Sequence, residues 1–104
     1  MSKAIASILR SAQGLIDTSE KWTKGVSARD GFGLGVGTRD PRAVCRCSLG
    51  AISAITEDFE EKYMAHAALR RVVGESIAEF NDASAHREVM VAFAKAIEAE
   101  EAAQ

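Results

Sequence analysis

The chain has 104 residues, of which 47% are hydrophobic and 27% charged, and its net charge at pH 7 is −2. This length is typical of one domain with its own core, and the composition excludes an intrinsically disordered chain. The longest uncharged run, residues 47–56, is far shorter than the roughly 20 apolar residues that cross a bilayer. We therefore expect one soluble cytoplasmic domain over residues 1–104, with a frayed acidic tail at residues 98–104 and no membrane contact.

Charge is distributed unevenly along the chain. Residues 1–50 contain eight Lys or Arg and four acidic residues, whereas residues 51–104 contain five and eleven. Folding can mix these charges or leave two faces of opposite sign, and two such faces would favour a charged partner or association between copies of the chain. A homodimer is one prediction that follows. The overall acidity argues against a dedicated nucleic-acid-binding protein.

Two patterns lie in the first third of the chain. Apolar residues recur at helical spacing over residues 3–18, which predicts an amphipathic helix. Further on, the turn residues 29–31 predict a β-hairpin that pairs residues 25–28 with residues 32–36.

The second hairpin strand is rich in glycine. Phe32, Leu34 and Val36 alternate with glycines, a period of two that is typical of a strand with one apolar and one bare face. Because an isolated hairpin is only marginally stable, we expect the apolar face to pack on the helices. The aromatic residues in general, Trp22 and Tyr63 included, are expected to belong to the core.

A second helix is predicted to start at Asp40 and Pro41. A carboxylate is a favoured N-cap, and proline fits the first helical position because its missing N–H would be unpaired there in any case. An apolar stripe continues over residues 44–55. This interpretation puts Cys45 and Cys47 on the same helix.

The third helix has signals at both ends. Thr56 or Asp58 can cap it, the helical pattern covers residues 59–73, and Gly74 is a stop signal.

The last part of the chain is also helical. A short apolar piece covers residues 76–80, Asn81 and Asp82 predict a turn, and Ser84 is predicted to open the final helix. The fold class is therefore mainly α (α+β), with four or five helices and one glycine-rich β-hairpin near residues 25–36.

The sequence does not favour a metal site or another cofactor. Cys45, Cys47, His66 and His86 are suitable ligand types, but zinc sites usually have Cys-x-x-Cys or His-x-x-x-His spacing. On a helix, residues i and i+2 lie about 200° apart, so the two cysteines could not face one ion.

A nucleophilic cysteine is an alternative. A position near a helix start and beside Arg42 or Arg46 could lower the pKa of Cys45. The two histidines that could act as a base are remote in sequence. A buried cysteine that packs as a small apolar side chain is the commoner case, so no catalytic residue is assigned.

Two groups of candidate residues follow from these patterns. The binding candidates are polar, charged or aromatic residues at predicted turns, loops or a helix start: Trp22, Lys24, Arg39, Arg42, Asn81 and Asp82. The structural candidates are small residues that permit close packing of a helix: Cys47, Gly50 and Ala51.

Four short motifs occur in order along the chain. They are Trp22-Thr-Lys-Gly25, Ala28-x-x-Gly31, Cys47-Ser-Leu-Gly50-Ala51 and Phe80-Asn81-Asp82. Together they resemble a small family of uncharacterised proteins, common in phages and bacterial genomes and classified as a domain of unknown function. The resemblance covers residues 4–98, and Cys45 is an addition to the pattern. It implies no reaction and no transferable catalytic residues.

The expected function is that of a non-enzymatic phage or mobile-element accessory protein. It would bind and inhibit a host defence protein complex or sequester a small signalling molecule. One alternative is a small or degenerate enzyme that uses Cys47 or the Asn81–Asp82 pair. Another is a nucleic-acid adaptor that uses the basic first half of the chain.

Overall fold

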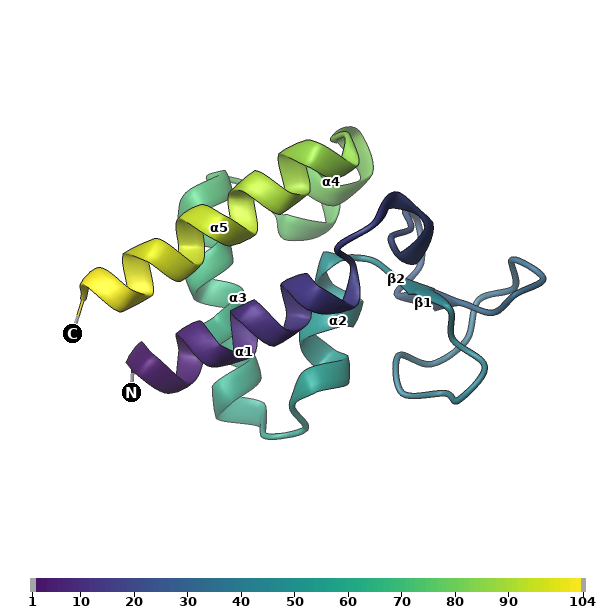
Figure 1. Ribbon diagram of the computed structural model, residues 1–104, viewed down its shortest axis with the longest axis horizontal. Helices are drawn as coiled ribbons and strands as arrows, with labels where there is room; N and C mark the ends of the chain where they lie inside the picture. Colours follow the sequence, from purple (N-terminus) through teal and green to yellow (C-terminus); the bar gives the residue numbers. More distant parts are fainter. Residues whose placement is uncertain (1, 104) are drawn as a thin grey trace.

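The computed structural model describes residues 2–103, and their side chains from Ala4 onward (Figure 1). Its elements in chain order are α1 (Ser2–Leu15), η1 (Ser19–Lys21, a 3₁₀ turn), β1 (Ala28–Arg29), β2 (Cys45–Arg46), α2 (Ser48–Ile55), α3 (Phe59–Val73), α4 (Ile77–Ala83) and α5 (His86–Ala102). The predicted fold class is confirmed: five α-helices accompany one small antiparallel sheet. Within the described residues, no helix is long and apolar enough to cross a membrane.

The first and last helices lie side by side and run in opposite directions (Figure 1). Two contacts fix this arrangement: Arg10 pairs with Glu101, and Gln13 Nε2 donates to the carbonyl of Met90 at 3.2 Å. α3 contacts both of these helices, α2 contacts α1 and α3, and α4 contacts α2 and α3. α5 continues through the acidic tail as far as Ala102, and fraying of this end stays a prediction.

One core joins the helices. Its largest fully buried apolar side chains include Leu9 from α1, Ile52 from α2, Leu69 from α3 and Phe93 from α5. Burial of each such side chain contributes about 1.5–3 kcal/mol. Helical periodicity in the sequence predicts a helix in each of these regions, and the apolar face of each helix supplies the core.

The third helix has the predicted bounds, because both of its ends are set by local chemistry. The Asp58 side chain accepts a hydrogen bond from Glu61 N at 2.8 Å, and Gly74 closes the helix in the left-handed conformation, at φ 73°.

The predicted start of the second helix is wrong. Asp40 and Pro41 enter a turn, and the helix begins eight residues later, at Ser48. The Asp40 carboxylate is engaged locally by the backbone N–H and guanidinium of Arg42. Val44 N then donates to Arg29 O at 2.9 Å, so the following residues extend along β1.

The strand pairing also differs from the prediction. β1 pairs with β2, in the register Ala28 to Arg46 and Arg29 to Cys45. The predicted contact between residues 28–30 and the glycine-rich stretch is present as a bridge between Arg29 and Gly35, with hydrogen bonds from Asp30 N to Leu34 O at 2.9 Å and from Val36 N to Ala28 O at 3.0 Å. β1 therefore lies between two extended segments. Cys45 belongs to β2 and Cys47 is the N-cap of α2, so neither cysteine lies inside a helix.

The apolar face of the glycine-rich stretch does not pack on the helices as predicted. Phe32 is 93% exposed and Leu34 is 65% exposed. Two further aromatic residues expected in the core, Phe59 and Tyr63, are also exposed on α3. The loops that flank β1 and β2 project from the end of the molecule opposite the two termini (Figure 1).

The predicted turn at Asn81 and Asp82 is likewise wrong, because both residues belong to α4. Ser84 follows that helix, and α5 begins at His86. Long-range hydrogen bonds of Asn81 to Trp22, Thr23 and Ser48 outweigh its local preference for a turn.

Candidate functional site

Asn81 is at the centre of a group of hydrogen bonds that we call the Asn81 junction: Trp22, Thr23, Gly25, Ser48, Asn81 and Asp82. Asn81 is 1% exposed. Its Oδ1 accepts from Trp22 Nε1 at 2.8 Å, from Ser48 N at 3.0 Å and from Ser48 Oγ at 2.7 Å. The partners fix the orientation of the amide, because an indole N–H can only donate.

The amide nitrogen completes the junction. Asn81 Nδ2 donates to Thr23 O at 3.0 Å and to Asp82 Oδ1 at 3.2 Å, and the same carboxylate oxygen accepts from Gly25 N at 3.0 Å. The junction therefore ties the loop after α1 and the start of α2 to α4. A buried amide destabilises a protein unless its polar groups are hydrogen-bonded. Both the oxygen and the nitrogen of the Asn81 amide have partners inside the protein, so we assign this side chain a structural role.

The Trp22 side chain contacts three residues of the surrounding structure. Beside its bond to Asn81, its ring lies 5.7 Å from that of His86, and Lys24 Nζ lies 5.3 Å from the ring centroid. His86 Nε2 is 2.7 Å from the carbonyl of Ile16, which can only accept, so this nitrogen carries the proton. These contacts join the ends of α1 and α5 to the junction.

The start of α2 packs directly on the segment before β1. A Cβ built on Gly50 would lie 2.1 Å from the carbonyl oxygen of Ser27, so only glycine fits. Cys47 caps the helix, with Sγ accepting from Gly50 N at 3.3 Å. Ala51 is fully buried behind this contact.

The environment of Cys47 does not favour a thiolate. Burial raises the pKa of the thiol, more than the hydrogen bonds from nearby backbone N–H groups lower it. The hollow beside it, about 160 Å³, is lined by Asn81 and Asp82 among others, and none of its described lining residues is a histidine.

The structure divides the six binding candidates into two groups. Trp22, Lys24, Asn81 and Asp82 come together at the junction. Arg39 and Arg42 lie elsewhere, in the projecting loops.

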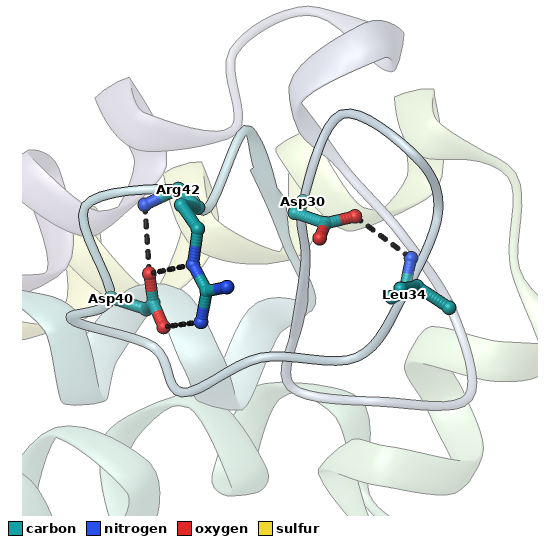
Figure 2. A network of polar contacts seen from close by, with 4 residues as sticks. All are labelled: Asp30, Leu34, Asp40 and Arg42. Carbon is teal, nitrogen blue, oxygen red and sulfur yellow. Dashed lines mark hydrogen bonds and ion pairs between the residues drawn. The ribbon is translucent and has the colours of Figure 1, made fainter.

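The projecting loops and their two strands form a second region, residues 24–46, which we call the loop lobe. Arg39 pairs with Glu57 at 3.3 Å, and Arg42 forms a two-contact pair with Asp40 (Figure 2). Hydrogen bonds from the Arg42 side chain and backbone lower the pKa of Asp40 to about 2. That carboxylate therefore stays charged at physiological pH.

Asp30 organises the tip of the lobe. Its buried carboxylate accepts from Leu34 N at 3.0 Å (Figure 2). The same carboxylate oxygen also accepts from Phe32 N at 2.9 Å. Arg29 also donates to Gly33 O at 2.9 Å and to Lys24 O at 3.0 Å. The tip thus has a defined shape while its two large apolar side chains point into solvent.

Sequence patterns do not reveal Ser48, Asp30 or the outward direction of Phe32. Ser48 follows Cys47 at the true helix start, a signal hidden by the stronger Asp40–Pro41 pattern. For Asp30 the pattern indicates only a turn. Among the described residues, no group of three or more His, Cys, Asp or Glu could hold a metal ion.

The junction and the lobe define a small helical domain with a projecting loop region that is held by its own hydrogen bonds. The chain belongs to the Family of unknown function (DUF6197), whose model matches residues 1–99. No curated protein and no solved structure matches the chain. The family membership agrees with the resemblance to a family of unknown function, whereas the motif assignments and the phage origin stay predictions.

Proposed function

We propose that this protein is a non-enzymatic accessory protein that binds another protein through its loop lobe. The observation that carries the proposal is the exposure of Phe32, 93%, at the tip of a loop whose backbone is fixed by Asp30. A large apolar side chain on an ordered loop loses little conformational entropy on binding. Aromatic anchors of this kind often dominate protein interfaces.

The charge of the lobe indicates the kind of partner. Residues 24–46 contain five Lys or Arg and two Asp, in a chain that is acidic overall. Leu34 and Val44 add exposed apolar surface, at 65% and 55%. The best complement is a protein with an apolar cleft and an acidic rim, since basic residues around an apolar anchor speed and orient association with such a surface.

Further parts of the proposal rest on the sequence resemblance alone. They are an origin in a phage or mobile element and inhibition of a host defence complex. Action in the cytoplasm is a separate expectation from the sequence. The exposed side chains of the lobe support one step that inhibition of a host complex requires, which is binding of a partner protein.

The test compares three forms of the protein as bait in a bacterial lysate. Wild type, the double variant Phe32→Ser/Leu34→Ser and Phe59→Ser are immobilised, and the captured proteins are quantified by mass spectrometry. Phe59 is a matched control because it is 82% exposed but lies on α3, outside the lobe. We expect a protein that wild type and Phe59→Ser retain and that the double variant loses.

Equal capture by all three forms would contradict the proposal. Self-association through the lobe is a competing outcome, and it corresponds to the predicted homodimer. Light scattering at two protein and two salt concentrations detects it, since a mass above 11.1 kDa that Phe32→Ser abolishes would assign the lobe to contact between copies.

A further inference from the structure

A hollow lies between α2, α3 and α4, on a part of the surface that includes neither the Asn81 junction nor the tip of the lobe. Its volume is about 420 Å³, within the range of small-molecule sites. Apolar side chains form one part of the lining: Leu49 from α2, Ala67 from α3, and Ile77 and Ala78 from α4.

Polar side chains of α3 form the other part. Tyr63, His66 and Arg70 follow one another at spacings of three and four residues, so they share one face of the helix. A second hollow of about 350 Å³ shares Ala67 and Arg70 with the first and adds Arg71. The two form one groove, the α3 groove, with Arg70 between them.

The charge of the α3 groove is opposite to that of the whole chain. The protein has 15 acidic and 13 basic residues, yet no Asp or Glu is among the described residues that line either hollow. Arg71 is paired with Glu100 at 3.2 Å, whereas Arg70 takes part in no ion pair between described side chains. The guanidinium of Arg70 is therefore available to an anion.

His66 is a second unusual feature of the same wall. Its Nε2 is the one buried side-chain polar atom, among those the structure describes, that has no hydrogen-bond partner. Burial and the neighbouring Lys62 lower the pKa of His66, which keeps the ring neutral at pH 7. Unpaired buried polar groups are rare in folded proteins, and a bound water or ion is one of their ordinary explanations.

Two other hollows differ in these respects. One, about 240 Å³, is lined by Asp58, Glu60 and Glu61, and the first and last of these already bond within the start of α3. Another, about 270 Å³ beside α5, carries Glu88 together with Arg87 and Lys95, so it has no single sign of charge. Only the α3 groove combines an apolar lining, a free arginine and an unpaired polar atom among the described residues.

We propose that the α3 groove binds a small organic anion with an apolar body, a carboxylate or a phosphate monoester. The anionic group faces Arg70, and the apolar body lies over Leu49 and Ile77. This inference is independent of partner binding by the lobe, and it gives a chemical class to the small ligand that the sequence analysis left open.

The experiment is a titration followed by ¹H–¹⁵N spectra of the full chain. The probes are phenyl phosphate and 3-phenylpropionate, with neutral 3-phenylpropanol and inorganic phosphate as controls. We expect both organic anions to shift the amides of Leu49, His66, Arg70 and Ile77 and to leave those of Phe32 and Leu34 unchanged. The two probes separate a preference for phosphate from one for carboxylate.

Two variants sharpen the test. Arg70→Gln should weaken binding of the organic anions by about tenfold or more, because a charge-assisted, two-pronged contact is lost. Arg71→Gln is the matched control and should change the affinity much less, since Arg71 is already paired. Both substitutions are on an exposed helix surface, and an unchanged melting temperature verifies that each variant is folded.

Three results would overturn the proposal. They are the absence of shifts in the groove at millimolar probe, equal affinity for the neutral alcohol, and equal affinity of wild type and Arg70→Gln. Inorganic phosphate that binds as tightly as phenyl phosphate would also overturn it, because the apolar lining would then contribute nothing. None of these outcomes bears on the lysate experiment with Phe32, so the two proposals fail separately.

Discussion

The Asn81 junction and the loop lobe are both held by hydrogen bonds, but the bonds differ in reach. At the junction, Asn81 bonds to Trp22, Thr23 and Ser48, which lie 33 to 59 positions away in the chain. In the lobe, the side chains of Asp30 and Arg29 bond to residues two to six positions away. The Asn81 side chain therefore stabilises the arrangement of the helices, whereas the side chains of Asp30 and Arg29 stabilise the shape of the lobe tip.

The two regions also differ in where their apolar groups lie. Trp22, Cys47 and Ala51 pack inward around the junction, while Phe32 and Leu34 extend into solvent. This contrast indicates that the Asn81 junction stabilises the fold, whereas the apolar side chains at the tip of the lobe are free to contact a partner. Substitutions in the two regions should accordingly have different effects.

Among the variants that test this contrast, and apart from a control in the core of α5, the largest effect is expected at Gly50. In Gly50→Ala, the new methyl group would meet the Ser27 carbonyl oxygen, which is held by a 3.0 Å bond from Cys47 N. We expect the free energy of unfolding to fall by about 3 kcal/mol, the upper end of the usual cost of overpacking. Urea unfolding measures it.

The control for this prediction is Gly14→Ala. Gly14 lies in α1, and a methyl group at this position would have no other atom within 4 Å, so alanine should stabilise the helix by about 0.5–1 kcal/mol. If both glycine variants unfold like the wild type, then α2 does not pack on Ser27 in solution.

The next largest effect is expected at Asn81. Asn81→Ala leaves Trp22 Nε1 and Ser48 N without their acceptor, and we expect a loss of about 2–3 kcal/mol from these unsatisfied donors. Urea unfolding followed by Trp22 fluorescence gives both the stability and the local environment of the indole.

Asn81→Asp is the sharper variant of the same test. It keeps the acceptor oxygens but loses the donor to Thr23 O, and it places a second carboxyl group beside Asp82. The free energy of unfolding of this variant should be lower than that of wild type at neutral pH. The difference should become smaller at low pH, because the introduced carboxyl group takes up a proton there. A deficit independent of pH would argue against the close contact with Asp82.

The junction shows what sequence reasoning can and cannot reach. The motifs that contain Trp22, Gly50 and Asn81 are visible in the sequence, but their common purpose depends on contacts across the fold that no local pattern contains. Turn propensity predicts a turn at Asn81, and tertiary hydrogen bonds place it in a helix. By contrast, Asp58 and Gly74 act on adjacent backbone, so they predict the ends of α3 correctly.

The lobe is predicted less well for a related reason. Asp40 and Pro41 have the local chemistry of a helix start, but the competing partners are Arg42 and the backbone of β1. Alternation of Phe32 and Leu34 with glycine indicates that one face is apolar. It contains no information on whether that face meets the core or solvent.

A smaller effect on global stability is expected at Asp30. Asp30→Ala removes the acceptor for two amides, so the tip should open locally, with a loss of about 1 kcal/mol. Hydrogen exchange should become faster at the amides of Phe32 and Leu34. Asp40→Ala, which removes the other carboxylate of the lobe, should leave exchange at those two amides unchanged, and equal acceleration in both variants would contradict the role given to Asp30.

The smallest effect on stability is expected at Phe32, and it tests the contrast most directly. Phe32→Ser should change the free energy of unfolding by less than about 0.5 kcal/mol, because the ring is 93% exposed and loses little burial. Phe93→Ala, in the core of α5, should cost about 3–5 kcal/mol. A loss of more than about 1 kcal/mol in the free energy of unfolding of Phe32→Ser would mean that the ring packs on the helices in solution. The ring would then not be exposed for a partner protein, which would contradict the contrast. An unchanged stability together with lost capture in the lysate experiment would separate binding from folding at a single side chain.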